Sequence, residues 1–237
     1  MHDNGNIASS SLERLIPTDI HGSDEAAAKQ YRIHVERYQF ASKFVSGQVL
    51  DCACGAGYGS NILANANSRV ETVTGVDIDP EAIDYAQSNY ARKSLDFVCA
   101  DAVKYDSGPF DTIVSFETIE HVPDPEALID NLASLLKPGG IFLASVPVTP
   151  SVDINPYHLH DFTQASFRRL FYKRGFKEVD SLLQVQPYEP VRMASQESRL
   201  KSMLGYYLSH PGAAWKRAYS TATDGFCNKY LSCAWQR

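Results

Sequence analysis

The chain lacks any apolar run long enough to cross a bilayer, and its first ten residues lack the apolar core of a signal peptide. It also lacks an excess of basic residues, because 22 lysines and arginines stand against 28 aspartates and glutamates. A broad nucleic-acid-binding surface would be basic, so the net charge of −6 disfavours one. We therefore expect no membrane span and no nucleic-acid partner.

Cysteine is scarce as well, and its spacing excludes a zinc-type pairing. Three of the five cysteines fall in segments expected to be buried, where the thiol acts as a small hydrophobe. The five are Cys52, Cys54, Cys99, Cys227 and Cys233. A reduced, cytoplasmic protein is the simplest interpretation.

The most informative motif is a glycine turn that lacks the third glycine of a dinucleotide fingerprint. The run 49–60 reads VLDCACGAGYGS, and G-x-G-x-x-G counted from Gly55 would need glycine or alanine where the chain has Ser60, with Gly59 one position early. The phosphate-binding loop G-x-x-x-x-G-K-[ST] is absent too. Asp51 would repel a pyrophosphate but suits a ligand with a cationic centre. The alternative is a turn of an ordinary α/β unit that binds nothing.

Hydrophobic periodicity alternates between strand and helix along the chain. Helices are expected at 26–45, 58–65, 80–92, 124–136 and 163–173, and strands at 48–52, 72–76, 95–99, 111–116, 141–146, 176–185 and 229–235. Such alternation predicts an α/β fold with right-handed crossovers and helices on both faces of a mostly parallel sheet.

Composition predicts where the folded domain begins and where a long insertion lies. Residues 1–24 are polar and irregular, which predicts a flexible arm before a single domain over 25–237. The segment 186–225 is too long for a simple link between two strands and has a helical stretch near 196–208. It is expected to be either a lid over the strand ends or a packing element that supports a homodimer.

An acid follows the strand expected at 72–76. The carboxylate of Asp77 can accept hydrogen bonds from both ribose hydroxyls of an adenosine at the carboxyl edge of the sheet. Asp79 is the competing candidate, but Pro80 begins the next helix and Asp79 suits its N-cap.

A second acid follows the strand expected at 95–99. Asp101 can accept from the amino group of an adenine, while the N–H of Ala102 meets a ring nitrogen. Ile78 and Val103 are placed to cover the faces of the base. The alternative for Asp101 is an ordinary loop acid.

The glycine turn, the two acids, an apolar fourth strand and the run Leu136-Lys137-Pro138-Gly139-Gly140 occur in an order that resembles the class I S-adenosylmethionine (SAM) methyltransferases. The resemblance extends over about residues 30–147. It implies a Rossmann-like, seven-stranded sheet with an antiparallel last strand, SAM as cofactor and a methyltransferase activity.

The resemblance also implies roles for single residues. Asp51 and the turn around Gly55 would face the methionine end of SAM, Phe116 would line the methyl-donor channel, and Arg37 and Tyr38 would reach the cofactor carboxylate. The remaining cofactor-binding residues expected in the turn are Ala53, Gly57 and Tyr58.

The acceptor side is expected in the run 116–123, FETIEHVP. If residues 117–121 turn helically, Glu117, Glu120 and His121 share one face, since positions i, i+3 and i+4 are neighbours. Two carboxylates and an imidazole form a candidate divalent-metal site, and a fourth ligand can come from the loop 157–163.

This arrangement resembles two metal-dependent O-methyltransferase families, the ubiquinone-biosynthesis enzymes and the small-RNA 2′-O-methyltransferases, which carry E-x-x-E-H. The second family also has a later histidine, which His158 matches by its spacing to Thr163. The resemblance implies that Mg²⁺ or another divalent cation grips vicinal hydroxyls. Two alternatives remain open: His121 as a metal-free general base, with Glu117 beside it, or a purely structural set.

Further runs, 32–41, 53–60 and 155–158, look like a bacterial methyltransferase group of surface-glycan pathways. The leading hypothesis is therefore methyl transfer from SAM to a hydroxyl of a sugar, polyol or other small molecule. The alternatives are a metal-free quinone-type or N-methyltransferase and a SAM-binding regulatory protein without catalysis. An NAD-dependent oxidoreductase is disfavoured by Ser60.

Overall fold

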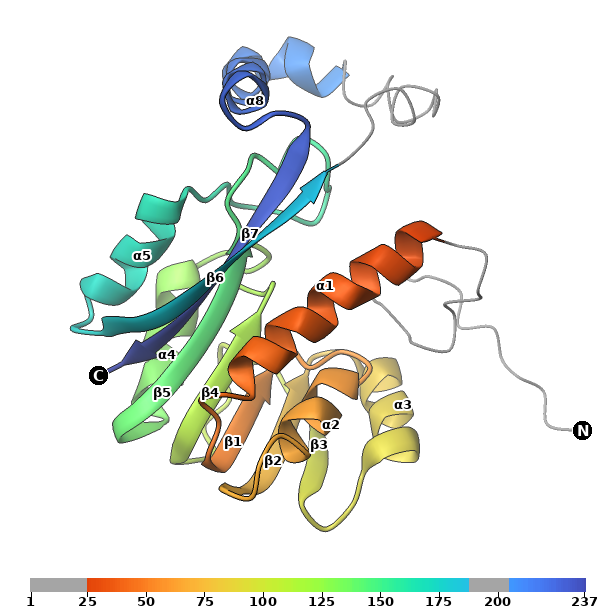
Figure 1. Cartoon of the computed structure of the whole chain (residues 1–237), viewed down its shortest axis with the longest axis vertical. Helices are drawn as coiled ribbons and strands as arrows, with labels where there is room; N and C mark the ends of the chain where they lie inside the picture. Colours follow the sequence, from red (N-terminus) through yellow and green to blue (C-terminus); the bar gives the residue numbers. More distant parts are fainter. Residues whose placement is uncertain (1–24, 188–204) are drawn as a thin grey trace, which may run out of the picture.

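The computed structural model describes residues 25–187 and 205–237 (Figure 1). Its strands form one seven-stranded sheet in the order β3-β2-β1-β4-β5-β7-β6. β7 is antiparallel to both of its neighbours, β5 and β6, whereas the other paired strands are parallel. This confirms the predicted fold class, including the antiparallel last strand.

The strands are β1 (Gly47–Cys52), β2 (Val70–Asp77), β3 (Leu95–Cys99), β4 (Phe110–Phe116), β5 (Leu136–Pro147), β6 (Lys177–Pro187) and β7 (Cys227–Gln236). The helices are α1 (Glu25–Ala41), α2 (Tyr58–Ala64), α3 (Pro80–Tyr90), α4 (Pro125–Ser134), α5 (Gln164–Tyr172) and α8 (Pro211–Asp224). No helix among the described residues combines the length and the hydropathy needed to cross a bilayer.

Two apolar layers, one on each face of the sheet, hold the helices in place. Alternate residues of a strand point to opposite faces, so Leu50 packs in one layer and Val49 in the other. α4 and α5 cover the first face, and α1, α2 and α3 cover the second (Figure 1). Because both faces are covered, the central strands are apolar on both sides, as a mostly parallel sheet requires.

The strand order reverses beside β1. The chain leaves β1 toward β2 and β3, and later returns to place β4 on the opposite side of β1. In open α/β sheets, ligands bind at such a switch point, beyond the carboxyl ends of the strands. α8 stands at the same end of the molecule, since Pro147 at the end of β5 pairs near the start of β7 (Figure 1).

The largest difference from the predicted elements lies at residues 136–147. Lys137–Gly140 was expected to end a helix, but α4 already ends at Ser134 and β5 begins at Leu136. The strand accommodates the glycine pair through a shift of register between Phe110 and Thr112 on its neighbour. α1 also ends at Ala41, four residues before the predicted end.

The predicted N-terminal arm, residues 1–24, lies outside the described residues, as does most of the helical stretch expected near 196–208. Within the segment 186–225, the structure describes the end of β6, a helical turn at 205–209 and α8.

Candidate active site at the carboxyl end of the sheet

The glycine turn joins β1 to α2 through residues with left-handed backbones. Ala53, Gly55 and Gly57 have φ angles of 56°, 53° and 80°. A Cβ built on Gly55 would meet no atom within 4 Å, so open space lies above this residue. A Cβ on Gly57 would instead collide with the side chains of Ala86 and Phe97, so packing demands glycine there. The turn thus offers exposed main chain at Gly55 for a ligand.

Asp51 lies beneath this turn rather than on its surface. Its side chain is fully buried and accepts hydrogen bonds from the Ser60 hydroxyl at 2.6 Å and the Tyr38 hydroxyl at 3.3 Å. Burial raises the pKa of Asp51 to about 7, although these two hydroxyls oppose the shift. Its carboxylate thus ties β1 to α1 and α2, and a role of Asp51 toward a ligand stays a prediction. Ser60, which replaces the third glycine of the fingerprint, is the residue that makes this contact.

Asp77 connects the end of β2 to the turn. Its Oδ2 accepts from the Gly55 N–H at 2.9 Å, and its Oδ1 accepts from the Asp79 N–H at 3.0 Å. Asp79 is the N-cap of α3 and accepts from the Glu81 N–H at 2.8 Å. The structure thus gives Asp79 the capping role expected for it and leaves Asp77 at the strand end.

Asp101 and Ile78 lie at the same edge of the sheet, because Asp77 and Cys99 are register partners at the ends of β2 and β3. The Asp101 carboxylate accepts from the Val103 N–H at 3.0 Å, and about a third of the side chain is exposed. Ile78 is 62% exposed, so its apolar side chain is open to a ligand at this strand end. An acid, a neighbouring half-buried Ala102 and an uncovered apolar side chain form a surface suited to a planar base.

Tyr58, the first residue of α2, packs against α1. Its hydroxyl lies 3.1 Å from Nδ1 of His34, and its ring lies near those of Tyr31 and Tyr38. Tyr38 in turn packs edge-on against Phe116, with ring centroids 5.3 Å apart. An aromatic layer therefore runs from α1 to the end of β4.

Arg37, a residue of α1, is buried beside the end of β4. Part of its guanidinium makes no hydrogen bond. Its side chain is 1% exposed, Nε donates to Gln184 at 2.8 Å, and the guanidinium stacks over the Tyr230 ring at 4.7 Å. Nη1 lies 3.5 Å from a Glu117 carboxylate oxygen, yet neither Nη1 nor Nη2 makes a hydrogen bond. Buried charged groups are normally hydrogen-bonded, so this arginine suits an anionic group of a ligand.

Glu117 departs from the expected helical turn. Its φ is 50°, in the left-handed region, and residues 117–121 do not form a helix. Its carboxylate accepts from the Ser145 hydroxyl at 2.8 Å and faces Arg37. Glu117 is not a member of the group formed by Glu120, His121 and His158, and its role as a metal ligand stays a prediction.

Three of the four predicted metal ligands do come together. One ligand atom each from Glu120, His121 and His158 lie within 4.8 Å of one another. Glu120 and His158 are buried and His121 is partly exposed, which opens the cluster on one side. Two imidazoles and a carboxylate with an open side form a facial arrangement that suits a divalent transition metal.

Hydrogen bonds around the cluster orient both imidazoles. Nδ1 of His121 lies 3.1 Å from the Tyr157 carbonyl, which only accepts, so in the neutral ring Nδ1 carries the proton and Nε2 the lone pair. Nδ1 of His158 lies 2.7 Å from the Ser151 hydroxyl. Burial, followed by the nearby His121, lowers the pKa of His158 to about 4, so this ring is neutral at pH 7. A neutral imidazole is the form that binds a metal.

Sequence reasoning did not find Ser151 or the Tyr157 carbonyl. No motif signals them, because their roles depend on how the loop after β5 folds back toward residues 120–121. That return is fixed by backbone contacts such as the Leu159 N–H to the Glu120 carbonyl at 2.8 Å.

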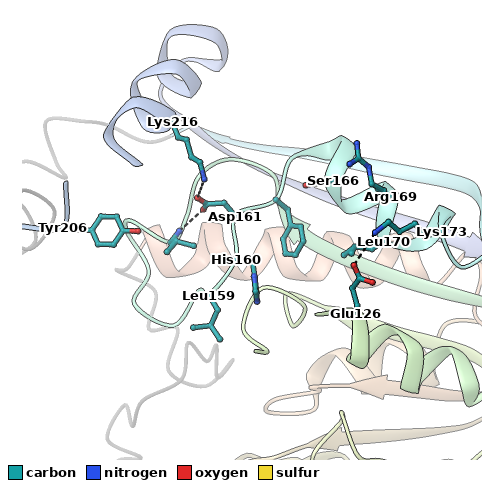
Figure 2. Close-up of a pocket in the computed structure, with 12 residues that line it drawn as sticks. Glu126, Leu159, His160, Asp161, Ser166, Arg169, Leu170, Lys173, Tyr206 and Lys216 are labelled. Atoms are coloured by element: carbon teal, nitrogen blue, oxygen red, sulfur yellow. Dashed lines mark hydrogen bonds and ion pairs between the residues drawn. The ribbon is translucent and has the colours of Figure 1, made fainter. Parts of the chain in front are cut away.

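An open groove of about 500 Å³ lies beside the same loop, between α5 and α8. Figure 2 shows Lys216 from α8 facing Asp161, and Lys173, just after α5, facing Glu126, with Leu159 and His160 between them. The groove carries both charge signs.

Residues 50–144 match the family described as "Methyltransferase domain". A Mycolicibacterium smegmatis protein named "Probable S-adenosylmethionine-dependent methyltransferase" is 29% identical over 64% of this chain and 61% of its own length. A Xanthomonas euvesicatoria ubiquinone biosynthesis O-methyltransferase is 34% identical over 50% of this chain and 51% of its own. The chain thus spans between half and two thirds of these curated relatives.

Among solved structures, the YcgJ protein of Bacillus subtilis superposes with a TM-score of 0.65 at 18% identity, covering 86% of this chain and 99% of that one. At this identity the likeness concerns the fold alone. The match at 50–144 runs from β1 into β5 and contains the turn, Asp77, Asp101 and the residues that follow β4. These matches support the predicted methyltransferase and extend to the part of the chain that forms the crevice.

Proposed function

We propose that this protein is a SAM-dependent O-methyltransferase. The match of residues 50–144 to a methyltransferase domain supports the reaction class, and the names of the two relatives support SAM as cofactor and a hydroxyl as acceptor. The observation that carries the proposal is the cluster of Glu120, His121 and His158 after β4 and β5, because it would add acceptor chemistry beside the proposed cofactor site.

The crevice residues fit the parts of SAM. Asp77 would accept from the ribose hydroxyls, and Asp101 with Ala102 would meet the adenine edge beside the exposed Ile78. The two guanidinium nitrogens of Arg37 that make no hydrogen bond would hold the cofactor carboxylate. When bound, SAM supplies a methyl group made electrophilic by a sulfonium.

The acceptor hydroxyl would meet the cluster on its open side. A divalent cation held by Glu120, His121 and His158 would act as a Lewis acid that lowers the pKa of that hydroxyl. The donor set contains two nitrogens and one carboxylate, so it favours Mn²⁺ or a similar transition metal over Mg²⁺, which prefers oxygen.

His121 can also remove the proton without a metal. Its Nε2 has the lone pair that a general base needs and lies 4.0 Å from a Glu120 carboxylate oxygen, which would stabilise the imidazolium. Arg37 and Glu117, at the end of β4, would align the donor side.

We propose a sugar, a polyol or another small vicinal diol as acceptor. Vicinal hydroxyls suit chelation, and the net charge of −6 disfavours RNA. The resemblance of the runs 32–41, 53–60 and 155–158 to a bacterial methyltransferase group of surface-glycan pathways supports a sugar acceptor.

The first experiment follows formation of S-adenosylhomocysteine from SAM with methyl glucoside, inositol and catechol as acceptor probes. We expect turnover that is lost after chelator treatment and restored by Mn²⁺. Replacing His121 by alanine should lower the rate by about 10²–10⁴, because His121 either helps to hold the metal or removes the proton. His210→Ala removes an exposed histidine outside the cluster and should leave the rate unchanged.

The outcomes separate the competing functions. Turnover that survives the chelator but not His121→Ala would support the metal-free base. Thermal stabilisation by SAM without turnover of any probe would favour a regulatory SAM-binding protein. At 100 times its Kd a ligand adds about 2.7 kcal/mol of stability, so stabilisation by NAD and none by SAM would refute the proposal.

A further inference from the structure

Helix α8 contacts the loop that carries His158 through a bidentate ion pair. Nε of Arg217 donates to Oδ2 of Asp153 at 2.8 Å, and Nη2 donates to Oδ1 at 2.6 Å. The same Nη2 also donates to the Pro150 carbonyl at 2.5 Å. The Asp153 carboxylate is 3% exposed, so this pair is largely shielded from water.

Two further contacts strengthen the attachment. The Tyr207 hydroxyl, from the helical turn just before α8, donates to Oδ2 of Asp153 at 2.5 Å. Burial alone would raise the pKa of Asp153, but the hydrogen bonds from Arg217 and Tyr207 hold it below its usual value. Lys216, next to Arg217, lies 3.6 Å from Asp161 (Figure 2).

These contacts converge on Ser151. Arg217 holds the residue before it, Pro150, and the residue two after it, Asp153. The Asp161 carboxylate accepts from the Ser151 N–H at 2.9 Å, which fixes the backbone of Ser151 from the other side of the loop. Ser151 is buried, and its hydroxyl lies 2.7 Å from Nδ1 of His158.

We infer that Arg217 of α8 is a positioning residue for the candidate acceptor site, acting through Asp153 and Ser151 to set the orientation of the His158 imidazole. The inference rests on the proposed function only in one respect, which is that the His158 imidazole binds a metal ion. The role of α8, the helix before β7, is then to hold the His158 imidazole in the orientation in which it joins Glu120 and His121. Such outer contacts typically change metal affinity by about 10–100-fold when removed.

The first test uses the protein without metal or SAM and reads His158 itself. Long-range ¹H–¹⁵N spectra of labelled protein report the tautomer and hydrogen bonding of each imidazole, and His158→Ala assigns the signals. In Ser151→Ala the His158 signals should move. In Arg217→Ala they should move in the same direction, whereas Trp215→Ala, on an exposed position of the same helix, should leave them unchanged.

The second test measures Mn²⁺ binding by titration calorimetry. Arg217→Ala and Ser151→Ala should each weaken binding by about 10–100-fold, and the double variant should be no weaker than Ser151→Ala alone, because both act on one contact. Arg217→Lys keeps the charge without the bidentate fork and should restore binding only in part.

Unchanged His158 signals in a folded Arg217→Ala, alongside shifted signals in Ser151→Ala, would overturn the inference, and so would additive effects in the double variant. If Arg217→Ala does not fold, Arg217→Gln combined with Tyr207→Phe carries the same test. Absence of Mn²⁺ binding by the unmodified protein would refute the metal part of the proposed function, while the spectra would still decide the role of Arg217.

Discussion

Asp51 is a buried carboxyl whose protonation changes across the neutral range. Burial raises its pKa to about 7, from an ordinary value of 3.8. Between these pH values the folded state therefore binds more protons than the unfolded state. The contribution of Asp51 to the free energy of unfolding is complete below about pH 4 and declines as the pH rises through 7.

Asp51→Asn removes this titration and keeps an oxygen that can accept from Ser60. We expect the free energy of unfolding of the variant to rise relative to the native sequence as the pH increases from 5 to 8, by at most about 1.4 kcal/mol per pH unit. Urea unfolding at four pH values measures it. Asp84→Asn, at an exposed position, should give no such trend, and parallel curves for Asp51→Asn would contradict the assigned shift.

At the scale of elements, α1 and α2 meet where Gly59 faces the Tyr38 ring. A Cβ on Gly59 would overlap that ring, which Asp51 and Phe116 hold in place. Gly59→Ala should therefore destabilise the protein by about 1–3 kcal/mol, even though alanine favours helix.

Thermal unfolding of matched variants tests this packing. In Gly212→Ala the new methyl group would enter open space on α8, so we expect little change or a gain of up to about 1 kcal/mol. Equal melting temperatures for Gly59→Ala and the native sequence would show that the contact between Gly59 and the Tyr38 ring leaves room for a methyl group.

The sequence was sufficient to predict elements whose pattern is local. Apolar alternation located the strands, Pro80 located the start of α3, and Thr163 located the N-cap of α5. The sequence was not sufficient where one backbone angle sets the local structure. Glu117 has a left-handed φ of 50°, so the expected helical face does not form, and a glutamate gives no signal of such an angle. The contact between Ser151 and His158 was equally hidden, because it depends on a loop closed by α8, far along the chain.

At the scale of the whole molecule, a second aromatic layer, on the opposite face of the sheet from the first, joins α5 to the sheet. The rings of Phe171 and Trp235 stack with centroids 4.6 Å apart, and Phe142, Phe167 and Phe176 pack around them. Trp235 is fully buried in β7, between β5 and β6. This layer therefore links α5 to the strands β5 and β7 and to Phe176, the residue just before β6.

Phe171→Ala should lower the free energy of unfolding by about 3–5 kcal/mol, since it leaves a cavity among rigid rings. Far-ultraviolet circular dichroism and the fluorescence of Trp235, isolated by Trp215→Phe, should report one shared transition. Phe226→Ala removes an exposed ring and should change stability by less than about 0.5 kcal/mol. A Trp235 transition that precedes the loss of helix would show that this layer unfolds separately.

The position of β7 between β5 and β6 has a consequence for how the chain folds during its synthesis. Among the described strands β6 pairs with β7 alone, yet residues 188–226 are translated between them. At about 5–20 residues per second, a ribosome needs about 2–8 seconds to add that segment. Throughout that interval the nascent chain has its glycine turn and strands β1 to β5 available, while β6 waits for the strand that will tie it to β5. The glycine turn and the residues after β4 and β5 are thus translated before β6 gains its partner, whereas α8 and its contacts with the loop after β5 come last.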